Sequence, residues 1–152
     1  MITKPTTDAL IEDCCRELME GILPGLTDET LKLRLVMTET VLRNAAVRAA
    51  HEIAWMREET TALLAYARRV AARHGSAPLR AALTDAGAGP SDSLHLADVA
   101  ECYERAGRAF AAALAAAQEA GAADLVARAR ELLRDRIATE KEVMATYAVV
   151  GR

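Results

Sequence analysis

Residues 27–74 contain neither glycine nor proline, and this uninterrupted run is the feature that most constrains the fold. It opens on Thr27 and an acidic first turn, and it closes on the cationic pair Arg73-His74 before Gly75, as helices do. A single helix of this length would measure roughly 70 Å at about 1.5 Å per residue. Because that is too long for one compact domain, we predict a break or kink near Glu58–Thr61 that divides the run into two helices.

Helical patterns also fill most of the remaining chain. Cap chemistry at Pro5–Asp8 starts a first helix, which Pro24 and Gly25 end. A fourth long helix is predicted from Ser91 or Ser93 to Gly121, and a last one from about Ala123 to Val149. The sequence therefore predicts an all-α protein, an antiparallel helical bundle of four long helices with the second one broken. We expect a single domain over residues 1–152, with an irregular loop at about 76–93 that contains Gly87, Gly89 and Pro90 and in which residues 78–83 can form a helical turn.

Helical spacing gives each helix an expected inward face. In the central run these residues are Leu31, Leu35, Leu42, Ala49, Ile53 and Met56, followed by Leu63, Leu64, Ala67, Val70 and Ala71. In the fourth helix they are Leu96, Ala100, Tyr103, Gly107, Phe110, Leu114 and Ala117, and in the last helix Val126, Ala129, Leu133, Ile137, Met144 and Tyr147. The small-residue segment AFAAALAAA suits either a tight helix contact or an oligomer interface.

Composition excludes several classes of protein. Apolar residues make up 52% of the chain and aromatic residues only 3%, which favours closely packed helices over a sheet. A net charge of -3 gives no reason to expect nucleic acid as a partner. No apolar run is long enough for a membrane span, and no secretory pattern is present. Three cysteines, two of them adjacent, form a poor disulfide framework, so we expect a cytoplasmic protein with reduced thiols.

The first half of the central run has a second face that combines apolar and polar side chains. It comprises Met37, Thr40, Asn44, Val47, Arg48, His51 and Trp55. Such a face should be solvated if the helix only lies on a core. A helix covered on both sides is either central in its bundle or half-buried in a partner.

One polar cluster on this face is the candidate site. Asn44 and Arg48 can hold a carboxylate or phosphate, His51 can exchange a proton, and Trp55 can stack on a flat ligand. Glu140 falls on the predicted inward face of the last helix and would supply a counter-charge. The alternative to a ligand site is a buried hydrogen-bond network or a subunit interface.

No catalytic or metal motif accompanies this cluster. The helical metal motifs Glu-x-x-His and His-Glu-x-x-His are absent, and so are the nucleophile motif Gly-x-Ser-x-Gly and a complete phosphate loop. The pair Glu101 and Glu104 has no second acidic pair in phase with it. We therefore assign no catalytic residue, no metal ligand and no cofactor.

Three segments resemble a known family: KPTTDALIEDCCRELMEGILPGL, RLVMTETVLRNAAVRAAHEI and DLVARARELLRDRIATEKEVM. They are similar to a bacterial domain-of-unknown-function family of small all-helical proteins. Members of that family are often encoded beside aminoglycoside-phosphotransferase-like kinases and acyl-CoA dehydrogenases. Thr40 and Arg43 depart from the family pattern, as does the ATEKEV segment. The resemblance implies an accessory to a small-molecule kinase or to acyl-CoA metabolism.

Two hypotheses about function follow. The first is a non-catalytic accessory or assembly protein that docks on a partner, or on a second copy of itself, through the two-sided central helix. The second is a protein that binds, or an enzyme that acts on, an acyl or phosphorylated small molecule through the polar cluster.

Overall fold

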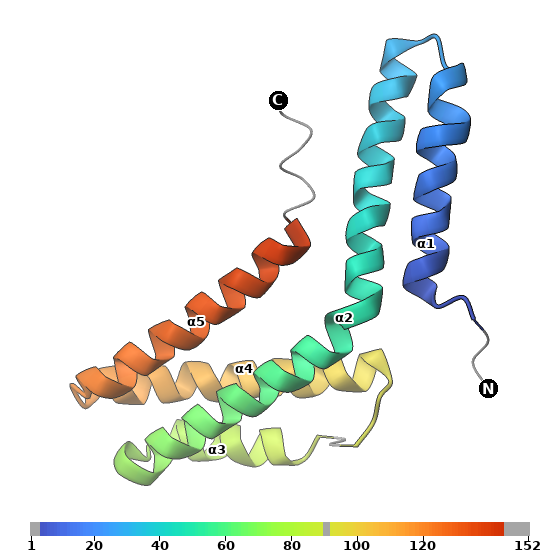
Figure 1. Cartoon of the computed structure of the whole chain (residues 1–152). Coiled ribbons are helices and arrows are strands. Elements are labelled where there is room, and N and C mark those ends of the chain that lie inside the picture. Colours follow the sequence, from blue (N-terminus) through green and yellow to red (C-terminus); the bar gives the residue numbers. More distant parts are fainter. Residues whose placement is uncertain (1–3, 90–91, 145–152) are drawn as a thin grey trace. The chain divides into compact units, whose positions relative to one another are not determined.

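The computed structural model describes residues 4–89 and 92–144, and this part of the chain is helical with no strand (Figure 1). The all-α prediction is confirmed. The α-helices are α1 (Thr7–Arg16), α2 (Glu29–His74), α3 (Ala77–Gly87), α4 (Leu96–Glu119) and α5 (Ala123–Met144). Between α1 and α2 lie a π-helix, Glu17–Ile22, and a 3-10 turn, Leu23–Gly25.

The chain divides into two compact units, which are described separately below. The first unit combines Met1–Glu52 with Thr139–Arg152, and the second is Ile53–Ala138. The expectation of a single domain stays a prediction. The expected count of four long helices is wrong, because the described residues form five α-helices and α1 and α3 are short.

The predicted division of the central run into two helices is wrong, because α2 is helical without interruption from Glu29 to His74, whereas a kink within it stays a prediction. The hydroxyl of Thr61 donates to the carbonyl oxygen of Arg57 at 2.9 Å, inside the same helix. The helix starts where Asp28 accepts hydrogen bonds from the backbone N–H groups of Thr30 and Leu31, at 2.7 and 3.2 Å.

Most of the segment expected to be an irregular loop forms α3. The hydroxyl oxygen of Ser76 accepts a hydrogen bond from the backbone N–H of Leu79 at 3.3 Å, and Pro78 occupies the first turn, where its missing N–H costs nothing. Leu79 is fully buried, which fixes the helix to the rest of the second unit. Only residues 88–95 separate α3 from α4.

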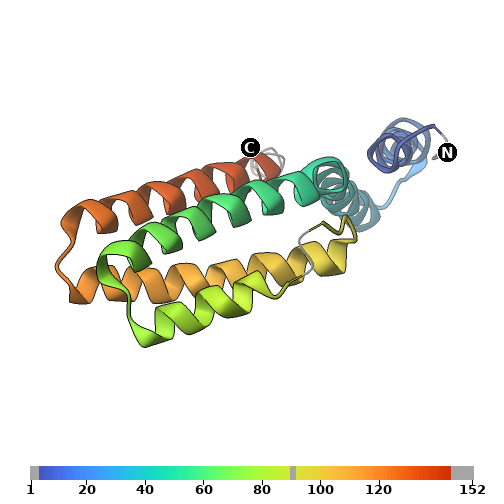
Figure 2. The same cartoon turned by 90° about the horizontal axis from the view of Figure 1, so that it is seen from below.

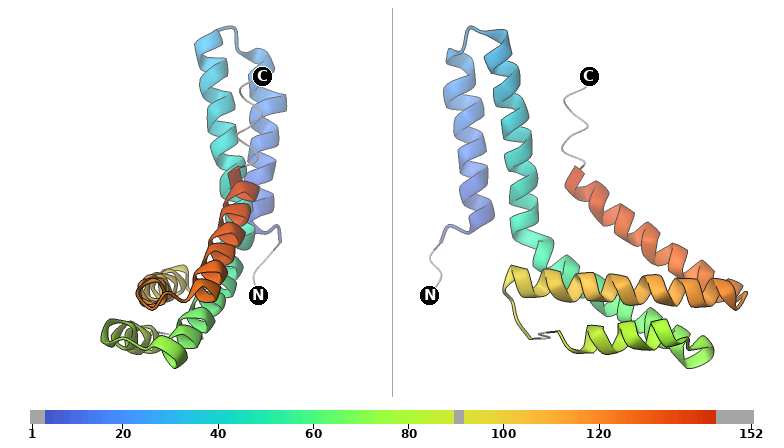
Figure 3. Two further views of the ribbon diagram at one scale, coloured as in Figure 1. Left: turned by 90° about the vertical axis from the view of Figure 1, so that its left-hand side faces the viewer. Right: turned by 180° about the vertical axis from the view of Figure 1, so that it is seen from behind.

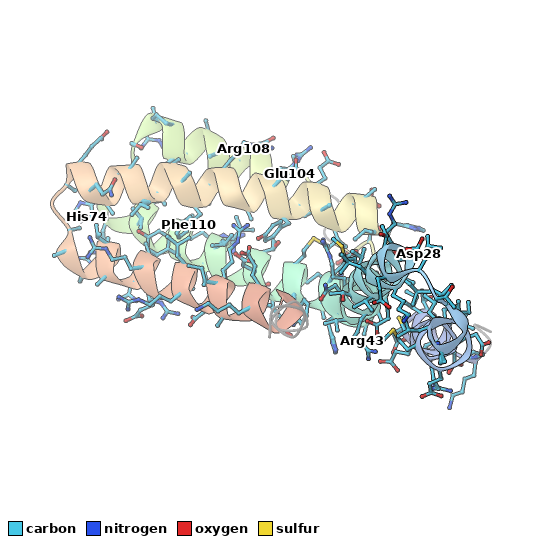
Figure 4. All side chains as sticks on the ribbon, turned by 90° about the horizontal axis from the view of Figure 1, so that it is seen from above. Asp28, Arg43, His74, Glu104, Arg108 and Phe110 are labelled. Carbon is cyan, nitrogen blue, oxygen red and sulfur yellow. The ribbon has the colours of Figure 1, made fainter. Side chains whose placement is uncertain are left out.

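In the second unit, the latter part of α2 packs with α3, α4 and α5, and consecutive helices run in opposite directions (Figure 2). Phe110 of α4 lies among these helices (Figure 4), with its ring centroid 5.2 Å from that of Tyr66. Most other core positions are small. The buried alanines are Ala67, Ala106, Ala109, Ala113, Ala116, Ala117, Ala122 and Ala129. These small side chains let the helix backbones approach closely, so the alanine-rich segment serves a tight contact within this unit.

The predicted inward faces are correct for α2 in this unit and partly wrong for α4 and α5. Leu63, Ala67 and Val70 are buried as expected. In α4 and α5 the buried faces are rotated, and the core side chains are Val99, Ala106, Ala109, Phe110, Ala113, Ala116, Ala117, Leu125, Ala129 and Leu132. Leu96, Leu133 and Ile137 were predicted to point inward and are exposed, whereas Phe110, Ala117 and Ala129 are buried as predicted. Tyr147 lies outside the described residues.

A Schellman turn joins α4 to α5. Gly121 adopts a positive φ of 65°, which a residue without a Cβ does at little cost. The Ala122 N–H donates to the Ala117 carbonyl at 2.9 Å, and the Gly121 N–H to the Gln118 carbonyl at 3.0 Å. The turn is followed at once by Asp124, whose carboxylate accepts a hydrogen bond from Arg73 at 2.6 Å. That bond lowers the pKa of Asp124.

Two tyrosines of the second unit should respond in opposite directions to loss of the hydroxyl. The Tyr66 hydroxyl is buried without a hydrogen-bond partner among the described residues, and burial raises its pKa. Tyr66→Phe is therefore expected to raise the free energy of unfolding by about 1 kcal/mol. The Tyr103 hydroxyl donates to the Glu59 carboxylate at 2.8 Å, so Tyr103→Phe should lower it by about 1 kcal/mol. Urea denaturation of both variants checks this, and destabilisation by Tyr66→Phe would contradict it.

Candidate functional site

The first unit contains a helical hairpin in which α1 lies beside the initial part of α2 (Figures 1 and 3). Two helices offer little interior, and the hairpin buries few side chains. The buried ones among its described residues are Cys15, Glu39, Thr40, Asn44 and Ala46. Much apolar surface therefore stays outside: Leu10, Ile22, Leu31, Leu33, Met37 and Val41 are exposed.

A small polar contact joins the two helices of the hairpin. The Cys15 thiol lies 3.8 Å from the carbonyl oxygen of Glu39, and burial raises the pKa of this thiol. The Glu39 carboxylate accepts hydrogen bonds from the Arg43 guanidinium, with Nε at 2.8 Å. Because the buried carboxylate is satisfied by a cation on its own helix, we interpret this contact as structural.

The predicted inward stripe of α2 does not hold in the first unit. Leu31 and Ala49 are exposed, whereas Glu39, Thr40 and Asn44 are buried. Thr40 compensates by donating to the Val36 carbonyl at 2.9 Å. Part of the face expected to be the second, mixed one thus turns inward, and of the expected core stripe Leu35 and Leu42 are only half-buried.

The candidate site residues lie in different surroundings. Asn44 is only 6% exposed, and neither its amide nitrogen nor its amide oxygen has a hydrogen-bond partner among the described residues. Arg48 is exposed and pairs with Glu52 of its own helix at 3.0 Å. His51 is exposed as well.

The remaining two candidates belong to different units. Trp55 is half-buried and belongs to the second unit. Glu140 is exposed, so its predicted inward position on α5 is wrong. The assembly of all five side chains into one cluster stays a prediction.

One face of α2 in the first unit carries exposed apolar and charged side chains. Six residues fall within an arc of about 80° at 100° per residue, and we call them the exposed stripe, in which Ala45 and Glu52 are half-buried and the others exposed: Arg34, Met37, Val41, Ala45, Arg48 and Glu52. Met37 and Val41 at its centre are 56% and 55% exposed. Charged residues lie towards its ends. Figure 4 shows Arg43, which is not part of the stripe, on the same helix.

The second unit contains a groove that sequence patterns did not indicate. It has a volume of about 330 Å³ and lies between α2, the end of α3, the connection after α3 and the start of α4. Its lining residues include Arg57, Thr60, Leu64, Arg68, Val99 and Cys102. Arg57 and Arg68 are eleven positions apart in the sequence, and nothing in their immediate context distinguishes them from other surface arginines.

Other classes of site find no support in the described part of the chain. No group of three or more His, Cys, Asp or Glu side chains there could hold a metal ion. Among the same residues, no helix is long and apolar enough to cross a membrane. No protein-family description, curated protein or solved structure matches this chain, so the resemblance to a bacterial helical family stays a prediction.

Proposed function

We propose that this protein is a non-catalytic assembly protein that associates with a second copy of itself through the exposed stripe of α2. The observation that carries the proposal is the exposure of Met37 and Val41 at the centre of a stripe with charged ends. A two-helix hairpin cannot bury such a stripe by itself, and pairing with another hairpin would produce a four-helix arrangement.

The residue order of the stripe favours a second copy as the partner. In an antiparallel pairing centred on position 43, Val41 would lie opposite Ala45 of the second copy, a large side chain against a small one. Met37 would lie opposite Ala49, and Arg34 opposite Glu52. Each contact would occur twice, as a two-fold interface requires. The Glu52 carboxylate can accept from Arg34 of the second copy while it keeps its bond to Arg48.

The wild-type protein is expected to be a dimer at micromolar concentration, and Val41→Glu should convert it to a monomer. The substitution places two carboxylates near the two-fold axis, where they would lose solvation and repel each other. Light scattering coupled to size-exclusion chromatography measures the mass. Leu94→Glu is the matched control, because Leu94 is an exposed leucine of the second unit and its replacement should leave the dimer intact.

A charge exchange tests the register of the pairing. Arg34→Glu alone should weaken the dimer by facing Glu52 with a like charge, and Arg34→Glu combined with Glu52→Arg should restore part of the affinity. A monomeric wild-type protein, or a dimer that Val41→Glu leaves unchanged, would overturn the proposal.

The second hypothesis, a small-molecule site at the polar cluster, retains one supporting observation. The Asn44 amide is buried without a partner among the described residues, and such groups cost free energy unless something satisfies them. A kinase or an acyl-CoA dehydrogenase as protein partner is a proposal that rests on the resemblance alone. The cytoplasmic location likewise stays a prediction.

A further inference from the structure

The groove of the second unit has the size and composition of a ligand site. One wall is a face of α2 on which Arg57, Thr60, Thr61, Leu64 and Arg68 follow at helical spacing. The first and last of these are separated by roughly 16 Å along the helix axis, at about 1.5 Å per residue. The groove volume of about 330 Å³ lies within the usual range of small-molecule sites.

The charged side chains among the described lining residues of this groove are both arginines. Arg57 donates to the carbonyl oxygen of Ser93 at 3.2 Å, and no ion pair joins Arg57 or Arg68 to a carboxylate among the described residues. Among the described residues that line the groove, none is Asp or Glu. Two guanidinium groups without carboxylates in a protein of net charge -3 form a local site for anions.

Thr60 adds a second, independent observation. Four other helical threonines donate their hydroxyl to the carbonyl four residues earlier, namely Thr38, Thr40, Thr61 and Thr84. The Thr60 hydroxyl makes no such bond, and it is buried without a partner among the described residues. This oxygen has no exposed surface, so a ligand oxygen in the groove would reach it only after a change of the Thr60 side-chain rotamer.

The rest of the lining is apolar enough to hold a hydrocarbon chain. Leu64 of α2 and Val99 of α4 line the groove together with Ala86 of α3. The combination of apolar walls with two arginines that pair with no described carboxylate matches a molecule that has an oxyanion at one end and a linear apolar chain.

We propose that this groove binds a linear amphipathic oxyanion, either a fatty carboxylate or a monoalkyl phosphate, with Arg68 or Arg57 holding the oxyanion. The two ligand types share the same chemistry, and the experiment separates them. The proposal concerns the second unit and is independent of the dimer proposed above.

Titration of the full-length protein with octanoate, octyl phosphate and octanol tests whether the groove recognises the negative charge of the ligand as well as its hydrocarbon chain. The two oxyanions should bind at the groove, the tighter one identifying the ligand type, and neutral octanol should bind at least about tenfold more weakly. Arg68→Gln or Arg57→Gln should weaken oxyanion binding about tenfold. Arg69→Gln is the matched control, because Arg69 is the next exposed arginine on α2 and does not line the groove.

The cysteines of the chain report where the ligand binds. Cys102 lines the groove, whereas Cys14 is exposed in the first unit. Octanoate or octyl phosphate should slow alkylation of Cys102 several-fold and leave the rate at Cys14 unchanged, as mass spectrometry of the digested protein would show. Equal binding of octanol, equal effects of the Arg57, Arg68 and Arg69 variants, or no protection of Cys102 would each overturn the proposal.

Discussion

The Leu79→Ala variant is expected to lose about 3 kcal/mol of unfolding free energy, the usual cost of a cavity at a fully buried leucine. Leu79 is the buried side chain of α3, and it packs into the core of the second unit. Without it, α3 keeps the half-buried Ala82 and Leu83 and the ion pair of Asp85 with Arg108, which are weaker anchors than a fully buried leucine. The fluorescence of Trp55, the only tryptophan in the chain, reports unfolding of this unit in urea.

Leu94→Ala is the control for this experiment. Leu94 is 67% exposed, and its replacement should change stability by no more than about 0.5 kcal/mol. If both variants unfolded at the same urea concentration, α3 could not be anchored to the core as the structure shows.

A larger side chain on the buried alanine face of α4 should also lower the free energy of unfolding. Ala113 is fully buried between other small residues, so Ala113→Leu must displace neighbouring helices or force strained side-chain rotamers. We expect a loss of about 2–3 kcal/mol. The matched substitution Ala111→Leu lies two residues away at an exposed position, where it should be nearly neutral.

Thermal unfolding followed by circular dichroism compares the two alanine variants. A melting temperature lowered equally by Ala113→Leu and Ala111→Leu would mean that helix propensity, and not close packing, decides the effect. Equal stability of Ala113→Leu and the parent would indicate space beside α4 that the structure does not contain.

Helix existence could be predicted from this sequence, whereas the buried faces of α4 and α5 could not. The prediction placed the largest apolar residues inside, as in Leu96, Leu133 and Ile137. In an alanine-rich helix, several faces have similar apolarity, and periodicity alone does not choose among them. The alanine face is the buried one because neighbouring helix backbones come close to it. That closeness arises only when the helices pack, so the pattern of a single helix does not reveal it.

The predicted break in α2 was wrong for a different reason. It depended on the assumption that all helices share one compact domain, and not on any residue that ends a helix. Glu58, Glu59 and two threonines interrupt the apolar pattern, but each is compatible with a helix, and Thr61 bonds within it. A length argument therefore cannot replace a stop signal.

The sequence identified polar residues on α2 but not the groove. Residues on one helix can be related by their spacing, which is why Asn44, Arg48 and His51 were considered together. The groove depends on α3 and α4, which bring Ala86 and Val99 to the face of Arg57 and Arg68. The sequence indicated only a helical turn at residues 78–83, whereas α3 extends to Gly87 and contributes this wall of the groove.

The Schellman turn between α4 and α5 has a consequence for the evolution of the chain. One inserted or deleted residue there would rotate α5 by about 100° relative to α4. Leu125, Ala129 and Leu132 would then leave the core together, and Asp124 would lose its place beside Arg73. A substitution in α5 affects the contacts of one residue, but an inserted or deleted residue at Gly121 would affect every core contact of α5. Homologues that keep this fold should therefore align across the turn without gaps, even where few of their residues are identical.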